Sequence, residues 1–384
     1  MRIRIINRYE PLDSNAKPIY KLNTPLFVIL LLFLMLNMTS ANMQAVIMAV
    51  ASLYPIFKWF KQKKVNSFML LFCLFVFFLV MMGLTSTHAI TTYYLISELK
   101  ILILFTLPFF FYFLLEGLDY KVILNQVFHF YISIVLIVTS YGYLTTGRFR
   151  DTGFLGFSIY ISVTLVLFLS QLYYETSLYW KILTLISIFM LGSSNGLIAY
   201  FILIIIKAGI PRITKVIPAI LATVISYWYI TEFRGRELLN GGFWTIDRVL
   251  ISTSVIRYTG KYFDFWNYLL GFGIGKSLND FHIISPIESD QINGFIKWFM
   301  GVNSGGVYPF SFHNEFLRIF YNFGLIGLFL VLVYLYKYLD RTTFVILLIT
   351  CLTNTIIYST IGLFTLSFLI AVNQLEKADQ SSEG

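Results

Sequence analysis

The sequence predicts an all-α protein: a polytopic bundle of about twelve transmembrane helices with one large extracytoplasmic loop that contains short helices. Of the 384 residues, 58% are hydrophobic and only 12% are charged, which is too apolar for a soluble domain to cover with a polar surface. Apolar stretches of bilayer-spanning length recur from Pro25 nearly to the C-terminus. The basic residues lie between these stretches and form no single stripe, so the net charge of +9 does not indicate nucleic-acid binding.

Six helices are expected in the first half of the chain. The basic N-terminal segment is long for the n-region of a signal peptide, so the first apolar run is interpreted as a retained helix. A spanning helix needs about 20 mostly apolar residues. The expected helices cover 25–38, 42–60, 67–84, 96–115, 122–144 and 154–172.

Six more helices are expected in the second half, at 179–191, 196–206, 216–230, 314–336, 344–357 and 360–372. The apolar stretch from 179 to 206 is too long for one upright helix, and the Gly-Ser-Ser-Asn-Gly run at 192–196 predicts a turn that divides it. Asn354 and the Tyr-Ser-Thr run at 358–360 predict a second outer turn. The polar tail after Gln374 is expected to be disordered. The chain thus divides into helices (1–230), an extracytoplasmic loop (231–312), C-terminal helices (313–373) and a tail (374–384).

Basic segments fall at alternate helix ends: the N-terminus, 58–64, Lys121, Lys181, 207–215 and 337–341. Short segments rich in Lys and Arg stay in the cytoplasm, so the opposite ends are expected to face outward. Two outward segments stand out, at 145–153 and 231–312. The longer one holds seven basic and seven acidic residues and many aromatic residues, so we expect it to pack against the bundle.

Several other classes of site are disfavoured. Cys73 and Cys351 lie in apolar segments and offer neither a metal-ligand spacing nor a disulfide. The glycines of 271–275 lack the spacing of a nucleotide-binding loop and predict a tight connection. No internal repeat relates the two halves, which weakens a transporter hypothesis. His129 is the clearest polar candidate inside a helix, and we interpret it as a packed residue.

A candidate catalytic histidine stands where the large loop becomes a helix. His313 at the outer mouth could take a proton from a sugar hydroxyl near neutral pH. Asn314 or Glu315 could orient or polarise it. The alternative is a histidine that caps the helix or lies at the membrane interface.

Arg148, Arg150 and Arg248 are candidate ligands for a lipid diphosphate, because a guanidinium stays charged and binds phosphate oxygens in a fixed fork. Such cations would stabilise the negative charge that grows on a departing diphosphate, and no metal would then be needed. The outer loops offer no convincing carboxylate pair or histidine cluster for a metal. The alternative for each arginine is a salt bridge, with Asp151 and Asp247 as neighbouring partners.

In its ordered motifs, the chain resembles the O-antigen polymerase and ligase superfamily of bacterial membrane glycosyltransferases. The resemblance covers roughly residues 145–330, and the first six helices resemble the family only in topology. Many relatives carry an arginine where this chain has Asn195, which leaves one phosphate contact unaccounted for. The motifs are Arg-Phe-Arg-Asp-Thr-Gly at 148–153, Ser-Ser-Asn-Gly at 193–196, Arg248 followed by Leu-Leu-Gly-Phe-Gly-Ile-Gly at 269–275, and His-Asn at 313–314 before Gly-Leu-Ile-Gly at 324–327.

The resemblance implies a metal-independent inverting transferase without a cofactor, which uses undecaprenyl-diphosphate-linked oligosaccharides at the outer face of the bacterial inner membrane. His313 and Arg248 would be catalytic, and the substrate-binding residues would be Arg148, Arg150, Asn314 and Glu315. We expect a Wzy-type polymerase of O-antigen, capsule or another surface polysaccharide, with the lipid bilayer, a chain-length regulator and a flippase as candidate partners. The alternatives are a ligase that passes the glycan to a lipid A core, and a polysaccharide flippase or other transporter.

Overall fold

The computed structural model describes residues 26–32, 47, 50–51, 92–147, 158–207, 224, 247–274, 278, 280–284, 290–302, 307, 312, 314–352, 354 and 356–382. These residues are mostly helical and contain no strand, apart from an isolated bridge between Leu278 and Val307, which confirms the all-α prediction. Two of the described helices, Tyr120–Thr146 and Glu315–Tyr338, are long and apolar enough to cross a membrane, judged by length and composition. The helices expected at 42–60, 67–84 and 216–230 lie almost wholly outside the described residues.

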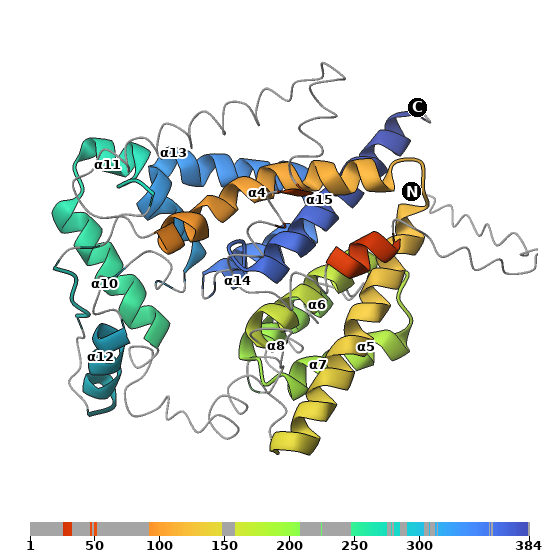
Figure 1. Cartoon of the computed structure of the whole chain (residues 1–384), viewed down its shortest axis with the longest axis horizontal. Helices are drawn as coiled ribbons and strands as arrows, with labels where there is room; N and C mark the ends of the chain where they lie inside the picture. Colours follow the sequence, from red (N-terminus) through yellow and green to blue (C-terminus); the bar gives the residue numbers. More distant parts are fainter. Residues whose placement is uncertain are drawn as a thin grey trace, which may run out of the picture.

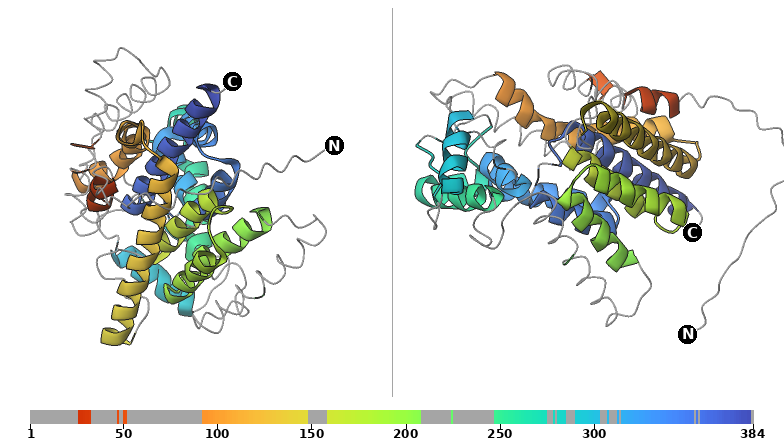
Figure 2. Two further views of the ribbon diagram at one scale, coloured as in Figure 1. Left: turned by 90° about the vertical axis from the view of Figure 1, so that its right-hand side faces the viewer. Right: turned by 90° about the horizontal axis from the view of Figure 1, so that it is seen from below.

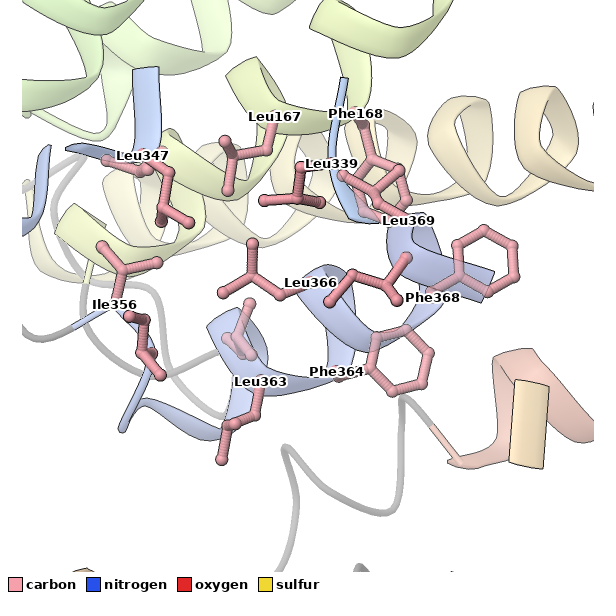
Figure 3. Packing of buried hydrophobic residues seen from close by; sticks show 14 of the residues in the cluster. Leu167, Phe168, Leu339, Leu347, Ile356, Leu363, Phe364, Leu366, Phe368 and Leu369 are labelled. Carbon is pink, nitrogen blue, oxygen red and sulfur yellow. The ribbon is translucent and has the colours of Figure 1, made fainter. Parts of the chain in front are cut away.

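The larger part of the described chain is a helical bundle with α15 inside it (Figure 1). The first half of α15 is buried on every side, as expected for a helix that is apolar all round. Phe111 of α4 packs edge-on against Phe364 and Phe368 of α15, with ring centroids 5.2 and 5.4 Å apart. Figure 3 shows side chains of α15 among those of α6 and α14. The bundle helices are α4 (Thr92–Leu115), α5 (Tyr120–Thr146), α6 (Ser158–Leu172), α7 (Leu178–Met190), α8 (Ser194–Lys207), α13 (Glu315–Tyr338), α14 (Arg341–Cys351) and α15 (Thr360–Ser382).

We call one end of the bundle the basic end. The helices α6, α8, α13 and α15 end there, and α5, α7 and α14 begin there. The Tyr174 hydroxyl, after α6, donates to the Lys207 carbonyl at the end of α8 (3.1 Å). Lys377 of α15 donates to the carbonyl of Lys337 in the last turn of α13 (2.7 Å). Apart from Lys100 in α4 and Arg318 in α13, the basic residues described in the bundle lie at this end: Lys121, Lys181, Lys207, Lys337, Arg341 and Lys377.

We call the opposite end the site end. The α7–α8 turn, the start of α13 and the α14–α15 turn lie there. The Ser162 hydroxyl near the start of α6 donates to the hydroxyl of Ser193 in the α7–α8 turn (2.6 Å). The carboxylate of Glu315, the first residue of α13, accepts a hydrogen bond from the backbone N–H of Ile357 in the α14–α15 turn (2.9 Å). These contacts bring three segments that are far apart in the sequence to one end of the bundle.

A second, smaller part is the loop lobe, formed by α10 (Asp247–Tyr262), α11 (Phe265–Leu270) and α12 (Asp290–Val302). It has its own apolar core, in which Phe281 lies between Tyr258 of α10 (6.0 Å between ring centroids) and Phe299 of α12 (6.4 Å). Figure 2 shows the lobe beside the bundle, with α13 reaching from one to the other. The described part of the large loop is therefore folded, as its aromatic composition predicts.

The division of the 179–206 stretch is confirmed, since α7 ends at Met190 and α8 begins at Ser194. The expected bounds of α14 were wrong. The helix begins at Arg341 because the Asp340 carboxylate caps it, accepting from the N–H groups of Thr342 and Thr343. It ends at Cys351, and the apolar residues up to 357 that the sequence assigned to the helix include a turn.

The tail also differs from expectation. α15 continues to Ser382, whereas disorder was expected from residue 374. The run Leu-Glu-Lys-Ala at 375–378 consists of strong helix formers, and it extends a helix that packing has already started. The tail thus belongs to the basic end of the bundle.

Candidate functional site

The start of α13 is fixed by a helix cap. Asn314 has an extended backbone, and its side-chain oxygen accepts a hydrogen bond from the N–H of Leu317 (3.1 Å). This arrangement satisfies one of the free donors of the first turn. His313, directly before the cap, lies outside the described residues, as do Arg148 and Arg150, so their proposed roles stay predictions.

The Glu315 carboxylate anchors α13 to the α14–α15 turn. Its side chain is fully buried. One oxygen accepts from the N–H of Ile357 (2.9 Å) and the other from the N–H of Tyr358 (3.0 Å). The thiol of Cys351 lies 3.9 Å from the same carboxylate. Hydrogen bonds to an ionised acceptor are among the stronger ones in proteins, so the first turn of α13 and this turn hold each other in place.

Arg318 is a buried cation that our sequence analysis did not single out. Its side chain is 3% exposed, and its guanidinium carbon lies 3.7 Å from the ring centroid of Tyr358. Asn322, one turn further along α13, is also fully buried. Positions 315, 318 and 322 share one helix face, so α13 carries a polar stripe in its first half. The signal was available in the sequence, since Arg318 is a charge inside an otherwise apolar helix.

α13 is broken at Gly324, where the backbone is left-handed and non-helical (φ 64°, ψ −166°). A Cβ at this residue would lie 2.3 Å from the carbonyl oxygen of Leu269 in α11. A Cβ on Gly271, which also has a positive φ of 84°, would lie 2.4 Å from the carbonyl oxygen of Asn322. Two glycine motifs that are 53 residues apart (324 − 271) thus meet backbone to backbone. We call this contact the glycine clasp.

The clasp is reinforced by a hydrogen bond and by aromatic packing. The N–H of Phe272 donates to the carbonyl of Tyr321 (2.7 Å), a residue of the last full turn before the break. The ring of Phe263 lies parallel to that of Phe272 (centroids 5.5 Å apart) and 5.6 Å from the ring of Tyr321. Phe312, just before His313, packs edge-on against Tyr321 at 5.7 Å. The loop lobe is therefore fastened to the first half of α13.

Arg248 lies in the first turn of α10. The opposite end of α10 is the one that leads to Phe263 and the clasp. With a rise of 1.5 Å per residue, the two ends of this 16-residue helix are about 22 Å apart. The clasp therefore does not itself bring Arg248 to the start of α13, and Arg318 is the described arginine nearest to that start in the chain.

The Ser-Ser-Asn-Gly turn is a buried cap at the site end. The Ser193 hydroxyl accepts from the N–H of Gly196 in the first turn of α8 (3.1 Å). A Cβ at Gly196 would lie 2.5 Å from the Cβ of Ser162, so this glycine permits close packing of α8 on α6. Asn195, in the same turn, is buried.

Two further features lie away from this site. His129 stacks on Trp180 with centroids 4.0 Å apart, as expected for a packed residue. At the basic end, a pocket of about 410 Å³ is lined by residues that include Asp119, Glu376 and Asp379. Among the described residues, no group of His, Cys, Asp and Glu side chains has the arrangement of a metal site.

No family model, no curated protein and no solved structure matches the chain.

Proposed function

We propose that the chain is a polytopic membrane glycosyltransferase that polymerises lipid-linked repeat units at the outer face of a bacterial inner membrane. The observation that carries the proposal is the pair of buried ionisable residues, Glu315 and Arg318, directly after His313 in an apolar helix. Ionisable groups inside a membrane-spanning helix are costly, and they are kept mainly where they serve a function. The site end is then the outer mouth of the bundle.

The distribution of charge supports this orientation. Lys and Arg are retained on the cytoplasmic side of membrane proteins, and Tyr and Trp gather at the interfaces. The basic end has both features. Lys181 lies 4.1 Å from the ring centroid of Tyr173, and Lys207 lies 5.3 Å from that of Tyr174. Long basic side chains can keep their charge in water while their stems cover apolar surface.

In the proposed reaction, a hydroxyl of the new repeat unit attacks the anomeric carbon of the lipid-linked chain. The bond between that carbon and the diphosphate oxygen breaks, and undecaprenyl diphosphate leaves with the bonding electrons. His313 takes the hydroxyl proton. Arginine side chains stabilise the charge on the departing diphosphate, and neither a metal nor a cofactor is required.

The residues have distinct proposed roles. Asn314 and Glu315 position His313, because one caps the helix that follows it and the other fastens that helix to the bundle. Arg248, with Arg148 or Arg150, binds the diphosphate. Arg318 adds a cation beneath the start of α13. The lipid-linked substrate reaches the site from the bilayer, and a flippase and a chain-length regulator are the proposed partners.

The test uses purified protein and lipid-linked repeat units extracted from a source strain from which the gene for this chain has been deleted. A ladder of longer glycans from these units alone is the expected result. Transfer that appears only after lipid A core is added would indicate a ligase instead. If neither product forms, while repeat units cross the bilayer of proteoliposomes, the proposal is wrong and the chain is a transporter.

The variants His313→Ala and Arg248→Ala are expected to insert normally and to lose chain growth, so that cells display at most one repeat unit. An exposed residue of the loop lobe, Lys297, provides a matched control. Lys297→Ala should give the wild-type length distribution on a gel. Wild-type lengths in the first two variants would refute the site assignment.

A further inference from the structure

The loop lobe carries an exposed aromatic surface beside α13. Phe265 and Trp266, the first residues of α11, are 68% and 65% exposed, and Tyr262 at the end of α10 is also exposed. The other side of α11 is occupied, since the ring centroids of Tyr268 and Phe320 of α13 are 6.0 Å apart. The short helix α11 therefore packs on α13 through one side and leaves large aromatic side chains exposed on the other.

We call the exposed residues Tyr262, Phe265 and Trp266 the aromatic anchor. From these features we propose that the anchor lies in the outer leaflet of the bilayer, at the boundary between headgroups and acyl chains. The inference rests on the proposed function, because it needs α13 to cross a membrane. It adds a second attachment of the protein to the lipid, through the lobe.

The level of α11 along α13 supports this assignment. α11 and the residues after it contact α13 between Phe320 and Gly324, five to nine residues after Glu315. At 1.5 Å per residue, this contact lies about 8–14 Å below the start of the helix. The headgroup region of one leaflet is about 5–8 Å thick, so α11 comes to the level where that region meets the acyl chains.

The apolar surface also continues onto the bundle helix. Leu325 and Ile326 follow Gly324 directly, and both are exposed, as is Phe329 one turn further on. In a spanning helix these side chains face lipid. Gly324 touches Leu269 and Gly271 at the end of α11, so the exposed surface of α13 begins where α11 ends.

The charges beside the anchor fit a phospholipid surface. Arg257 and Lys261 are exposed on the last turns of α10, and the ammonium group of Lys261 lies 4.8 Å from the ring centroid of Tyr262. Asp264, also exposed, uses its carboxylate to cap α11 by accepting from the N–H of Asn267 (2.7 Å). Aromatic rings with adjacent basic groups are typical of the membrane interface, where the bases meet lipid phosphates.

The consequence for the site is one of placement. A lobe held at the headgroup level, and clasped to α13 just below His313, would bring its inner surface to lipid-linked diphosphates where they emerge from the bilayer. A second copy of this chain or another segment of it could also cover the anchor. Quenching by brominated lipids distinguishes lipid from either of these occupants.

The test places one fluorescent label at a time on full-length protein in phosphatidylcholine–phosphatidylglycerol nanodiscs. In a background with Cys73→Ser and Cys351→Ala, single cysteines replace Trp266, Trp298 or Phe329. Trp298 of α12 is the matched control, because it is a tryptophan of the same lobe with 60% exposure but lies on a different helix. Quenching is measured with aqueous iodide and with brominated lipids, which carry the bromine near the headgroup for the label at 266 and deep in the acyl chains for the label at 329.

The label at 266 is expected to lose most of its emission to the shallow bromines and to resist iodide, whereas the label at 298 should respond to iodide. If 266 behaves like 298 while 329 is quenched by lipid, the anchor is refuted and the membrane bundle stands. Shielding of 266 from both quenchers means that protein covers it, which also refutes the anchor. If 329 is not quenched by lipid, the bundle does not span a membrane and the proposed function fails with the anchor.

Discussion

The two ends of the bundle solve the burial of polar groups in different ways. At the basic end, the Thr343 hydroxyl links α6 and α14, since it contacts the Ser170 hydroxyl (2.5 Å), the Gln171 side chain (3.3 Å) and the Asp340 carboxylate. The polar side chains there satisfy one another, and the carboxylate among them is only partly buried. At the site end, a fully buried carboxylate binds backbone N–H groups, and a buried guanidinium lies on an aromatic ring.

Backbone packing differs as well. A Cβ would come within 3 Å of another atom at four glycines of the site end and the clasp: Gly196, Gly271, Gly324 and Gly362. Gly117 at the basic end and Gly147 after α5 have nothing within 4 Å of such an atom. The site end and the clasp thus combine charged groups with close backbone contacts.

The largest effect is expected at the glycine clasp. Gly324→Ala or Gly271→Ala would place a methyl group against backbone atoms at a positive φ, which should cost about 2–5 kcal/mol and detach the lobe from α13. We expect both variants to lose chain growth and to melt at a lower temperature in detergent. Gly260→Ala, in α10 with open space around the new Cβ, is the control and should be neutral or slightly stabilising. Equal melting temperatures in all three variants would show that the clasp does not hold the lobe.

The second largest effect is expected at Glu315 of the site end, and Thr343 of the basic end provides the comparison. Glu315→Ala would leave two buried N–H groups without their acceptor, at a cost of about 3–5 kcal/mol, and should release the start of α13. Thr343→Val at the basic end removes one hydroxyl and should cost about 1–2 kcal/mol while chain growth continues. The stability of both variants is measured by their melting temperatures, and chain growth by their glycan ladders. A greater loss of chain growth in Thr343→Val than in Glu315→Ala would overturn the distinction between the ends.

A smaller effect concerns the ring beneath Arg318. Tyr358→Leu removes the aromatic face that the guanidinium contacts, which should lower stability by about 1–2 kcal/mol. Tyr358→Phe keeps a ring in place and should lower it less. The two variants are compared by thermal melting of the purified protein. If both melt alike, the ring contact contributes little and Arg318 is held by other groups.

The smallest effect is expected on the surface of the basic end. Tyr174→Phe removes one exposed hydrogen bond to the carbonyl of Lys207, which water can replace, so the stability should change by less than about 0.5 kcal/mol. Chain growth should not change. A melting-temperature drop as large as that of Tyr358→Leu would mean that this end is as tightly built as the other.

The sequence predicted the helices better than the breaks within them. Apolar length alone located α5 and α13 to within a few residues, and the Gly-Ser-Ser-Asn-Gly run correctly divided α7 from α8. Ile356 and Ile357 were wrongly assigned to a helix because they are apolar. They are buried in a turn that the Glu315 carboxylate holds, and hydropathy cannot distinguish these two environments.

The site itself was predicted in part. The loop-to-helix boundary at Asn314 was visible in the sequence, since asparagine is a preferred cap. The contact between Gly271 and Gly324 was not visible, because the residues around either glycine do not indicate which other segment it contacts. Asp340 as the cap of α14 was visible and was overlooked. The candidate diphosphate ligands were arginines of the outward loops, so Arg318 was not among them.

The clasp between Gly271 and Gly324 has a consequence for how such a protein can diverge. Main-chain atoms make the close approach on both sides, so it requires glycine at both positions, while the rings of Phe263, Phe272 and Tyr321 reinforce it. A lobe of different composition could be joined to this bundle if it presented a glycine and compatible aromatic rings at the same place. Under the proposed function, recognition of new sugars would then arise by exchange of the lobe, with the helices beneath it unaltered.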